Sequence, residues 1–278
     1  MTSDKARAVL IFSANLVLLV TIRPALAADA SSWDGTERAA VRLIAGASRT
    51  VAGATIQRAG IEIRLAPGWK SYWRYPGDSG LPPRFDFSRS LNVKTVTVRW
   101  PAPQRLSDES GVSIGYKHDV VFTLEITAQD TAKPVMLALR IDYAVCEKLC
   151  VPADGKAELA LSGQASANDW KLAASDALVP RPVKIGEGTP TIRAVMREGS
   201  RILVDVAAPP GRIELFAEGP TPDWALPVPS PVAGAPEGQQ RFAFELDGLP
   251  AGAKPEGATL TLTAVAGEQA VEVPFRLD

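Results

Sequence analysis

The sequence predicts an all-β fold, with two antiparallel β-sandwich domains that follow an N-terminal signal peptide. Apolar side chains recur at every second position along many short segments, and helical periodicity is nearly absent. The 278 residues include 22 Gly and 23 Pro, which is enough to end many short strands in turns. Hydrophobic residues make up 46% of the chain and charged residues 22%, so the composition is that of a globular protein and excludes disorder and collagen-like repeats.

Charge and ligand counts exclude further classes of protein. The chain has 30 Lys+Arg against 31 Asp+Glu, so a formal net charge of -1 supplies no basic field to attract nucleic acid. Its single histidine, His118, and its two cysteines, Cys146 and Cys150, are too few for the usual nitrogen and sulfur ligands of a zinc site. We therefore expect no nucleic-acid partner, no metal site and no cofactor.

The first 27 residues have the pattern of an export signal. A basic start precedes an apolar run over residues 8–22, and Ala25 and Ala27 supply the small residues of a cleavage site. The run of 15 residues is shorter than the about 20 that a membrane-spanning helix needs, although Arg23 near the cleavage site leaves an uncleaved anchor as the alternative. Cleavage would start the mature chain at Ala28 and deliver it to an oxidising compartment, where cysteines form disulfides.

Residues 28–180 are expected to form the first domain. Alternation of apolar and polar side chains predicts strands at residues 61–65, 96–100, 120–126 and 135–145. The last of these strands ends at Cys146, and parity places this side chain on the more polar face, opposite that of Val145. Short helical patterns occur at residues 34–43 and 168–178.

The chain offers a domain boundary at residues 180–190, where Pro180 and Pro182 precede a stretch rich in Gly and Pro. Residues 187–278 are expected to form the second sandwich. The same alternation predicts strands at residues 202–206, 213–215, 242–246, 260–264 and 271–277. This part of the sequence contains no Cys and no His, so we expect it to be a spacer or a docking module.

The segment at residues 142–152 holds both cysteines, in a C-x3-C spacing at the end of a strong strand. A bridge between Cys146 and Cys150 would close a loop of five residues and stabilise the fold by only ~2 kcal/mol, against ~4 to 5 kcal/mol for a loop near 100 residues. A structural staple is therefore a weak use of the pair, and so short a ring favours a labile disulfide. Three uses stay open from these residues: thiol-disulfide exchange, a staple, and Cu(I) held by two thiolates.

Two further stretches lie between the predicted strands. Residues 65–83 contain four aromatic side chains within seven positions, namely Trp69, Tyr72, Trp73 and Tyr75. These side chains either shape a partner surface or pack into the edge of a sandwich. Residues 100–116 are polar and contain Gly, and we expect them to form a loop of the kind that lies over a site.

Four stretches together resemble the N-terminal periplasmic domain of the DsbD-type thiol:disulfide interchange proteins, and more closely its relatives in the ScsB-like branch. They are residues 67–86, 100–103, 115–117 and 142–153. The resemblance implies an immunoglobulin-like domain with one reversible cysteine pair. Such a domain accepts electrons from a membrane-embedded donor of the DsbD/CcdA type and passes them to oxidised periplasmic proteins of the thioredoxin fold.

The resemblance also implies roles for individual residues. Cys150 would form mixed disulfides with partners, and Cys146 would resolve them. Asp108 and Glu109 fall where the family's cap over the cysteines begins, although Ser110 and Gly111 replace the aromatic residue that follows in the family. Further candidates for the cap and partner surface are the aromatic side chains of Tyr116, Tyr143, Trp69 and Trp73.

The sequence thus predicts a periplasmic protein that carries out thiol:disulfide interchange. No transmembrane or thioredoxin-like domain follows before Asp278, so we expect the electron donor to be another polypeptide. Two alternatives stay open: a non-catalytic β-sandwich binding or scaffold protein with an inert disulfide, and a Cu(I)-handling protein. Copper tolerance and cytochrome c maturation are two settings for such a protein, and the sequence favours neither.

Overall fold

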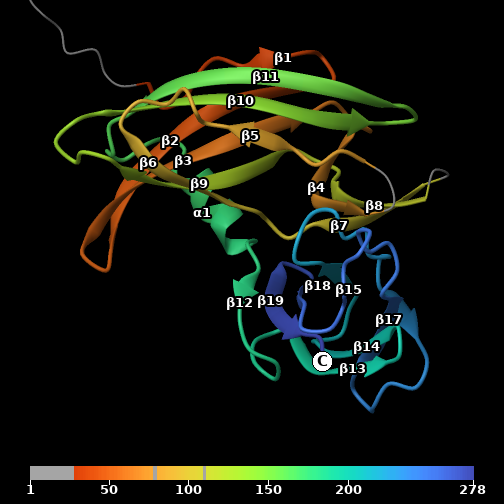
Figure 1. The fold of residues 1–278 in the computed structure, drawn as a ribbon. Helices are drawn as coiled ribbons and strands as arrows, with labels where there is room; N and C mark the ends of the chain where they lie inside the picture. The colour runs from red at the N-terminus through yellow and green to blue at the C-terminus, as the bar shows by residue number, and fades with distance from the viewer. Residues whose placement is uncertain (1–27, 78–79, 109–110) are drawn as a thin grey trace, which may run out of the picture.

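The computed structural model describes residues 28–77, 80–108 and 111–278 (Figure 1). In this part of the chain the secondary structure is almost entirely β, with a single helix, α1, at Asp169–Ala177. The strands form four sheets, and paired strands are antiparallel except where β12 meets β19. The all-β class predicted from the alternation of side chains is therefore confirmed.

Two sheets form the N-terminal part of the protein, and we call them the N-terminal sheets. The first has the strand order β1-β2-β3-β9-β6, with bounds Asp34–Gly35, Ala39–Val51, Ala54–Leu65, Val120–Ala128 and Val93–Arg99. The second has the order β11-β10-β4-β8-β7, with bounds Cys150–Leu161, Val135–Cys146, Lys70–Gly77, Gly111–Tyr116 and Gln104–Asp108. A short strand, β5 at Arg84–Asp86, also pairs with β10.

Side chains from both N-terminal sheets share one hydrophobic core. Ile61 and Ile63 of β3 and Phe122 and Leu124 of β9 are fully buried, whereas Arg64, which follows Ile63, is exposed. Each such burial is worth about 1.5–3 kcal/mol, so the alternation that predicts the strands also supplies the energy that packs the two sheets together. The four strands predicted before residue 180 correspond to β3, β6, β9 and β10, although Trp100 lies one residue beyond the end of β6.

Two more sheets, the C-terminal sheets, follow α1. One has the order β12-β19-β18-β15, with bounds Arg181–Pro182, Gln269–Arg276, Thr259–Ala266 and Ile213–Glu218. The other has the order β13-β14-β17-β16, with bounds Thr191–Glu198, Arg201–Ala207, Gln240–Glu245 and Ser230–Val232. They have a core of their own, which includes Val204, Phe242 and Leu262, and the five strands predicted beyond residue 200 coincide with β14, β15, β17, β18 and β19.

Helix α1 packs on the face of the first sheet that lies opposite the core. Its fully buried Leu172 lies over Gly46 and Gly60, where an added Cβ atom would approach the Leu172 methyl carbons to 2.3 Å and 2.7 Å. Glycine at these two positions therefore makes room for the helix. The helical pattern at residues 168–178 is confirmed.

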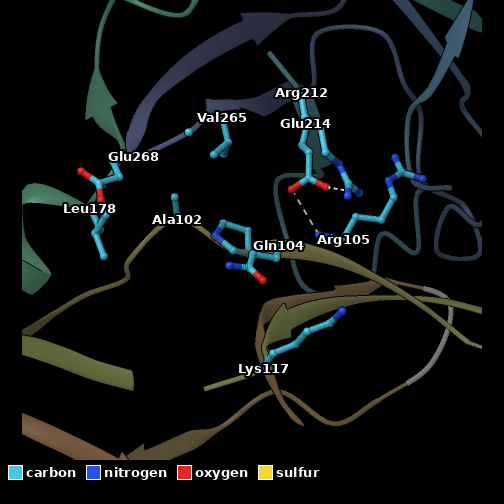
Figure 2. A pocket seen from close by; sticks show the side chains of 11 residues that line it. Ala102, Gln104, Arg105, Lys117, Leu178, Arg212, Glu214, Val265 and Glu268 are labelled. Atoms are coloured by element: carbon cyan, nitrogen blue, oxygen red, sulfur yellow. Dashed lines mark hydrogen bonds and ion pairs between the residues drawn. The ribbon is translucent and has the colours of Figure 1, made fainter. Parts of the chain in front are cut away.

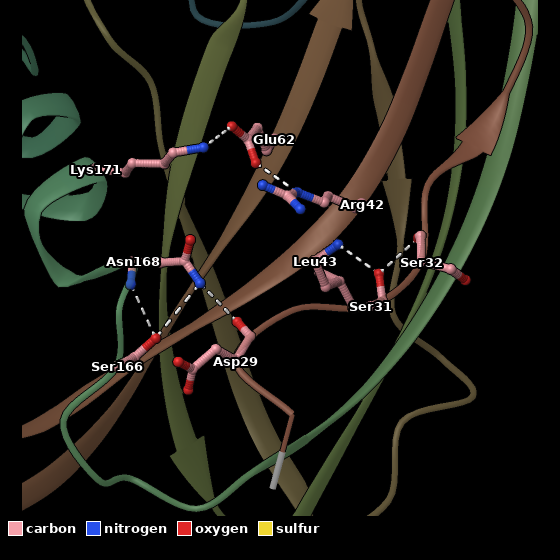
Figure 3. A network of polar contacts seen from close by, with 9 residues as sticks. All are labelled: Asp29, Ser31, Ser32, Arg42, Leu43, Glu62, Ser166, Asn168 and Lys171. Atoms are coloured by element: carbon pink, nitrogen blue, oxygen red, sulfur yellow. Dashed lines mark hydrogen bonds and ion pairs between the residues drawn. The ribbon is translucent and has the colours of Figure 1, made fainter.

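Polar contacts fasten this helix to the sheet (Figure 3). Glu62 on β3 accepts a hydrogen bond from Arg42 Nε at 2.6 Å and another from Lys171 on the helix. Asn168, just before the helix, donates to the carbonyl oxygen of Asp29 at 2.8 Å. The buried carboxylate of Glu62 is thus paired with two cations, as a buried charge requires.

The structure corrects two predictions and adds strands that the alternation did not reveal. Residues 34–43 are not helical but contain β1 and the start of β2, because Val41 and Leu43 are buried in the core at a spacing of two residues. Residues 104–108 and 111–116, expected to lie in a loop, form the paired strands β7 and β8. Strands β4 and β11, which flank β10, were not predicted.

The fold does not decide the prediction of a signal peptide. Residues 1–27 lie outside the described residues, so the signal peptide stays a prediction. Within the described ranges, no helix combines the length and the hydropathy that crossing a membrane would require.

Candidate functional site

The two cysteines face each other across a β-hairpin. Cys146 is the last residue of β10, Cys150 is the first of β11, and the strand register pairs them directly, with a Cα–Cα distance of 4.1 Å. They form a disulfide. The three residues between them make the tight connection, so the sequence spacing and the hairpin register together bring the two sulfur atoms into bonding range.

The two sulfur atoms differ in their access to solvent. Cys146 is only 4% exposed and packs with Tyr72 and Ala144 in a small cluster of its own, separate from the main core. Cys150 is exposed. The parity prediction for Cys146 is confirmed, because Val145 and Tyr143 point into the main core and Cys146 points away from it. A thiolate from outside therefore reaches Cys150 more readily than Cys146.

Tyr72 supplies the polar contact to the exposed sulfur. Its strand, β4, pairs with β10 at the disulfide, with Lys70 opposite Cys146. The Tyr72 hydroxyl lies 3.1 Å from Cys150 Sγ, and because a disulfide sulfur carries no hydrogen, the phenol is the donor. This residue was recognised in the sequence only as a member of the aromatic stretch. Neighbouring residues of a strand point to opposite faces, so Tyr72 faces away from Trp73. Once β4 is known to lie beside β10, this parity places Tyr72 on the same face as the cysteines.

Glycines hold the Tyr72 ring and its strand in place. Gly115 on β8 lies opposite Tyr72, and an added Cβ there would lie 1.9 Å from the Ser71 carbonyl oxygen. Gly80 lies against the ring, since an added Cβ would approach Tyr72 Cε1 to 2.4 Å. The close approach at both positions leaves the phenol little freedom to turn away from Cys150.

Three aromatic residues that the sequence assigned to a partner surface are buried instead. Trp73, Tyr116 and Tyr143 are 0%, 7% and 1% exposed, and all three belong to the main core. For Trp73 the reason is strand parity, because its side chain points to the opposite face of β4 from Tyr72. Trp69 is half-buried, with the Arg38 guanidinium 5.5 Å from its ring centroid, and it is the one predicted aromatic that keeps exposed surface.

Two of the buried tyrosines, Tyr143 and Tyr116, have raised pKa values. Burial raises the pKa of Tyr143 to about 12, with the charges of Asp154 and Asp34 adding to the effect. Burial also raises the pKa of Tyr116 well above its ordinary value, and its hydroxyl donates to the Pro101 carbonyl oxygen at 2.9 Å. Both phenols therefore stay protonated at neutral pH.

The predicted cap falls at strands β7 and β8. Asp108 ends β7 and pairs with Gly111 of β8, while Glu109 lies outside the described residues. Because β8 pairs with β4, these two strands belong to the same sheet as the disulfide. The role of Asp108 and Glu109 in shielding the cysteines stays a prediction.

Other polar features lie apart from the disulfide. His118 is exposed, and no cluster of three or more His, Cys, Asp or Glu that would suit a metal ion occurs in the described ranges. A cleft of about 480 Å³ lies between β7 and the C-terminal sheets (Figure 2). There Glu214 accepts a hydrogen bond from the Arg105 backbone N–H at 3.3 Å and forms an ion pair with Arg212 at 2.6 Å.

These features define a class of protein: an all-β protein that carries one accessible cysteine pair at the tip of a hairpin. Residues 42–162 match the family model described as "Thiol:disulfide interchange protein DsbD, N-terminal". The matched residues, which include Tyr72 and both cysteines, are thus similar to the N-terminal domain of DsbD. The resemblance identified from the sequence is confirmed.

A solved structure has the same fold over most of the chain. The crystal structure of the N-terminal periplasmic domain of ScsB from Proteus mirabilis aligns with a TM-score of 0.70 and 22% sequence identity, covering 90% of this chain and 98% of that one. At this identity the likeness shows the fold, and it extends over both the N-terminal and the C-terminal sheets. No curated protein sequence matches the chain.

Proposed function

We propose that the protein is a periplasmic thiol:disulfide interchange protein whose Cys146–Cys150 pair relays electrons. A membrane-embedded donor of the DsbD/CcdA type reduces the pair, and the pair then reduces oxidised periplasmic proteins of the thioredoxin fold. The observation that carries the proposal is the unequal access of the two sulfur atoms, with Cys150 exposed and Cys146 only 4% exposed. A disulfide with a purely structural role requires neither an exposed sulfur atom nor a hydrogen-bond donor beside it.

The exchange proceeds in two steps. The Cys150 thiolate attacks one sulfur of the partner's disulfide, the partner's S–S bond breaks, and the released partner thiolate takes a proton from water. The Cys146 thiolate then attacks Cys150 Sγ, which breaks the mixed disulfide and releases the second partner thiol. Two electrons and two protons have passed to the partner, and a donor dithiol returns Cys146–Cys150 to the reduced state by the reverse steps.

Tyr72 favours the first step. A phenol that donates to Cys150 Sγ stabilises the thiolate more than the thiol or the disulfide, because charged acceptors form the stronger hydrogen bonds. This contact favours the thiolate form of Cys150, which is the nucleophile.

We also propose that the chain divides into a redox domain at residues 28–180 and a second immunoglobulin-like sandwich at residues 187–278. Two hydrophobic cores, one built mainly by the N-terminal sheets and the other by the C-terminal sheets, and the two sets of sheets support this division. Copper tolerance and cytochrome c maturation remain predictions from the sequence resemblance.

Trapping of mixed disulfides tests the proposed function. Cys146→Ser should accumulate covalent adducts at Cys150 in a bacterial periplasm, because the resolving thiol is missing. The matched variant, Cys150→Ser, should form few adducts, because its remaining thiol is buried. Non-reducing electrophoresis and mass spectrometry measure both. Equal trapping by the two variants, or none by either, would contradict the assignment.

A further inference from the structure

Strand β4 touches the disulfide at one end and the C-terminal sheets at the other. At its start, Lys70 pairs with Cys146 and the Tyr72 hydroxyl contacts Cys150. The next three residues, Trp73, Arg74 and Tyr75, each contact the C-terminal part of the chain. One short strand therefore joins the redox pair to sheets that contain no cysteine and no histidine.

The contact at Arg74 is the strongest of the three. Its guanidinium donates to both carboxylate oxygens of Glu218 on β15, at 2.8 Å and 2.7 Å, and also to Glu272 on β19. The three side chains are only 27%, 16% and 28% exposed. Burial raises the pKa of Glu218, and the hydrogen bonds from Arg74 oppose this shift, so the guanidinium favours the charged carboxylate.

Apolar packing reinforces the ion triad. The Trp73 ring lies 5.9 Å from Phe216, centroid to centroid, and the Tyr75 hydroxyl donates to the Leu226 carbonyl oxygen. Phe216 and Val228, which follow residue 190, belong to the core of the N-terminal sheets. Figure 1 shows the C-terminal strands beside β4, β7 and β8. A packed apolar contact of this kind opposes the hinge motion that a polar domain junction permits.

We propose that the C-terminal sheets brace β4 and thereby set the redox properties of the Cys146–Cys150 pair, with Arg74 as the positioning residue and Tyr72 as the group through which it acts. This inference rests on the proposed function and gives the C-terminal sheets a task within it. The brace holds the Tyr72 phenol against Cys150 Sγ. Since the phenol stabilises the reduced thiolate more than the disulfide, a firm brace makes the pair easier to reduce.

A double-mutant cycle tests whether Arg74 acts on the disulfide through Tyr72. The equilibrium constant between the purified full-length protein and glutathione is measured for the wild type, Tyr72→Phe, Arg74→Gln and the double variant. Tyr72→Phe should shift the constant about tenfold toward the disulfide, which corresponds to a potential about 30 mV more negative. Arg74→Gln should shift it at least threefold in the same direction, and the double variant should match Tyr72→Phe alone.

Arg241 supplies the matched control. It donates to both carboxylate oxygens of Asp205, at 2.6 Å and 2.7 Å, within the C-terminal sheets and away from β4. Arg241→Gln should lower stability and leave the glutathione constant unchanged. If Arg74→Gln fails to fold, Tyr75→Phe removes a single hydrogen bond of the brace and should shift the constant in the same direction.

The possible outcomes distinguish a failure of the proposed role of Arg74 from a failure of the proposed function. A wild-type pair that exchanges with glutathione, together with an Arg74→Gln constant within twofold of the wild type, would overturn the brace alone. An equal shift in Arg241→Gln, or full additivity of Arg74→Gln with Tyr72→Phe, would also overturn it. A wild-type pair that glutathione cannot reduce would instead contradict the proposed function.

Discussion

Replacing Gly115 by alanine should force β4 away from β8 and so disturb the strand that carries Tyr72. The added Cβ would lie 1.9 Å from the Ser71 carbonyl oxygen and 2.9 Å from Tyr72 Cα. Both obstacles are backbone atoms, which cannot rotate away as a flexible side chain does. The two strands must separate by about 1 Å before the shorter contact reaches even 3.0 Å.

The expected loss of stability follows from this displacement. Overpacking costs ~1 to 3 kcal/mol, and the upper end applies because the obstacle is backbone. A weakened ladder hydrogen bond between β4 and β8 adds ~1 kcal/mol. The free energy of unfolding should therefore fall by about 3 to 4 kcal/mol. Urea unfolding followed by tryptophan fluorescence measures it, and the glutathione equilibrium should shift toward the disulfide as Tyr72 moves from Cys150.

Gly199 is the control for this substitution. No atom lies within 4 Å of its added Cβ, so Gly199→Ala meets only the cost of its positive φ, +66°, which is ~1 to 2 kcal/mol. Its glutathione equilibrium should equal that of the wild type. Equal unfolding free energies for the two alanine variants, with no redox shift in Gly115→Ala, would refute the reasoning.

Three further predictions concern the disulfide, the helix and a buried hydroxyl. Reduction of Cys146–Cys150 should lower the free energy of unfolding by only ~2 kcal/mol and leave the circular dichroism spectrum unchanged, because the bridge closes a loop of five residues; loss of the fold on reduction would contradict this. Leu172→Ala should cost ~2 to 5 kcal/mol in urea unfolding, because this fully buried side chain docks α1, yet leave the glutathione equilibrium unchanged; a shift there would show that α1 also positions the site. The stability contributed by protonated Tyr143, whose folded pKa is raised from 10.0 to about 12, is fully present below pH 10 and is lost as the pH rises toward 12. Tyr143→Phe removes a hydroxyl that has no hydrogen-bond partner in the described ranges, so it should preserve stability at pH 7 and flatten this alkaline decline; an unchanged decline would assign it to another group.

The sequence was most informative where side chains alternate strictly. The runs at residues 120–126 and 135–145 correspond to β9 and β10, and parity alone placed Cys146 on the face away from the main core. Alternation failed at residues 34–43, because Ala39, Ala40 and Val41 are all buried, so both faces of β2 bury apolar side chains at its start. A strand buried on both faces loses the period that distinguishes it from a helix.

The aromatic stretch shows what pattern alone left undecided. Residues 69–75 offered two interpretations, a partner surface or packing into a sandwich, and the structure divides the residues between different tasks. Trp73 enters the core, while its neighbour Tyr72 reaches Cys150. Which neighbour faced the cysteine depended on the register of β4 against β10, a contact between residues more than 70 positions apart in the chain.

The sequence by itself determined the all-β class, the main strands of both halves and the cysteine pair, because alternation and spacing are local properties of the chain. Its aromatic and glycine motifs also sufficed to identify the family of residues 42–162. Only the tertiary structure decided that Cys150 is exposed, that Tyr72 donates to it, and that Arg74 joins its strand to the C-terminal sheets. These facts depend on strand order and register, which arise from long-range packing and leave no local periodic signal.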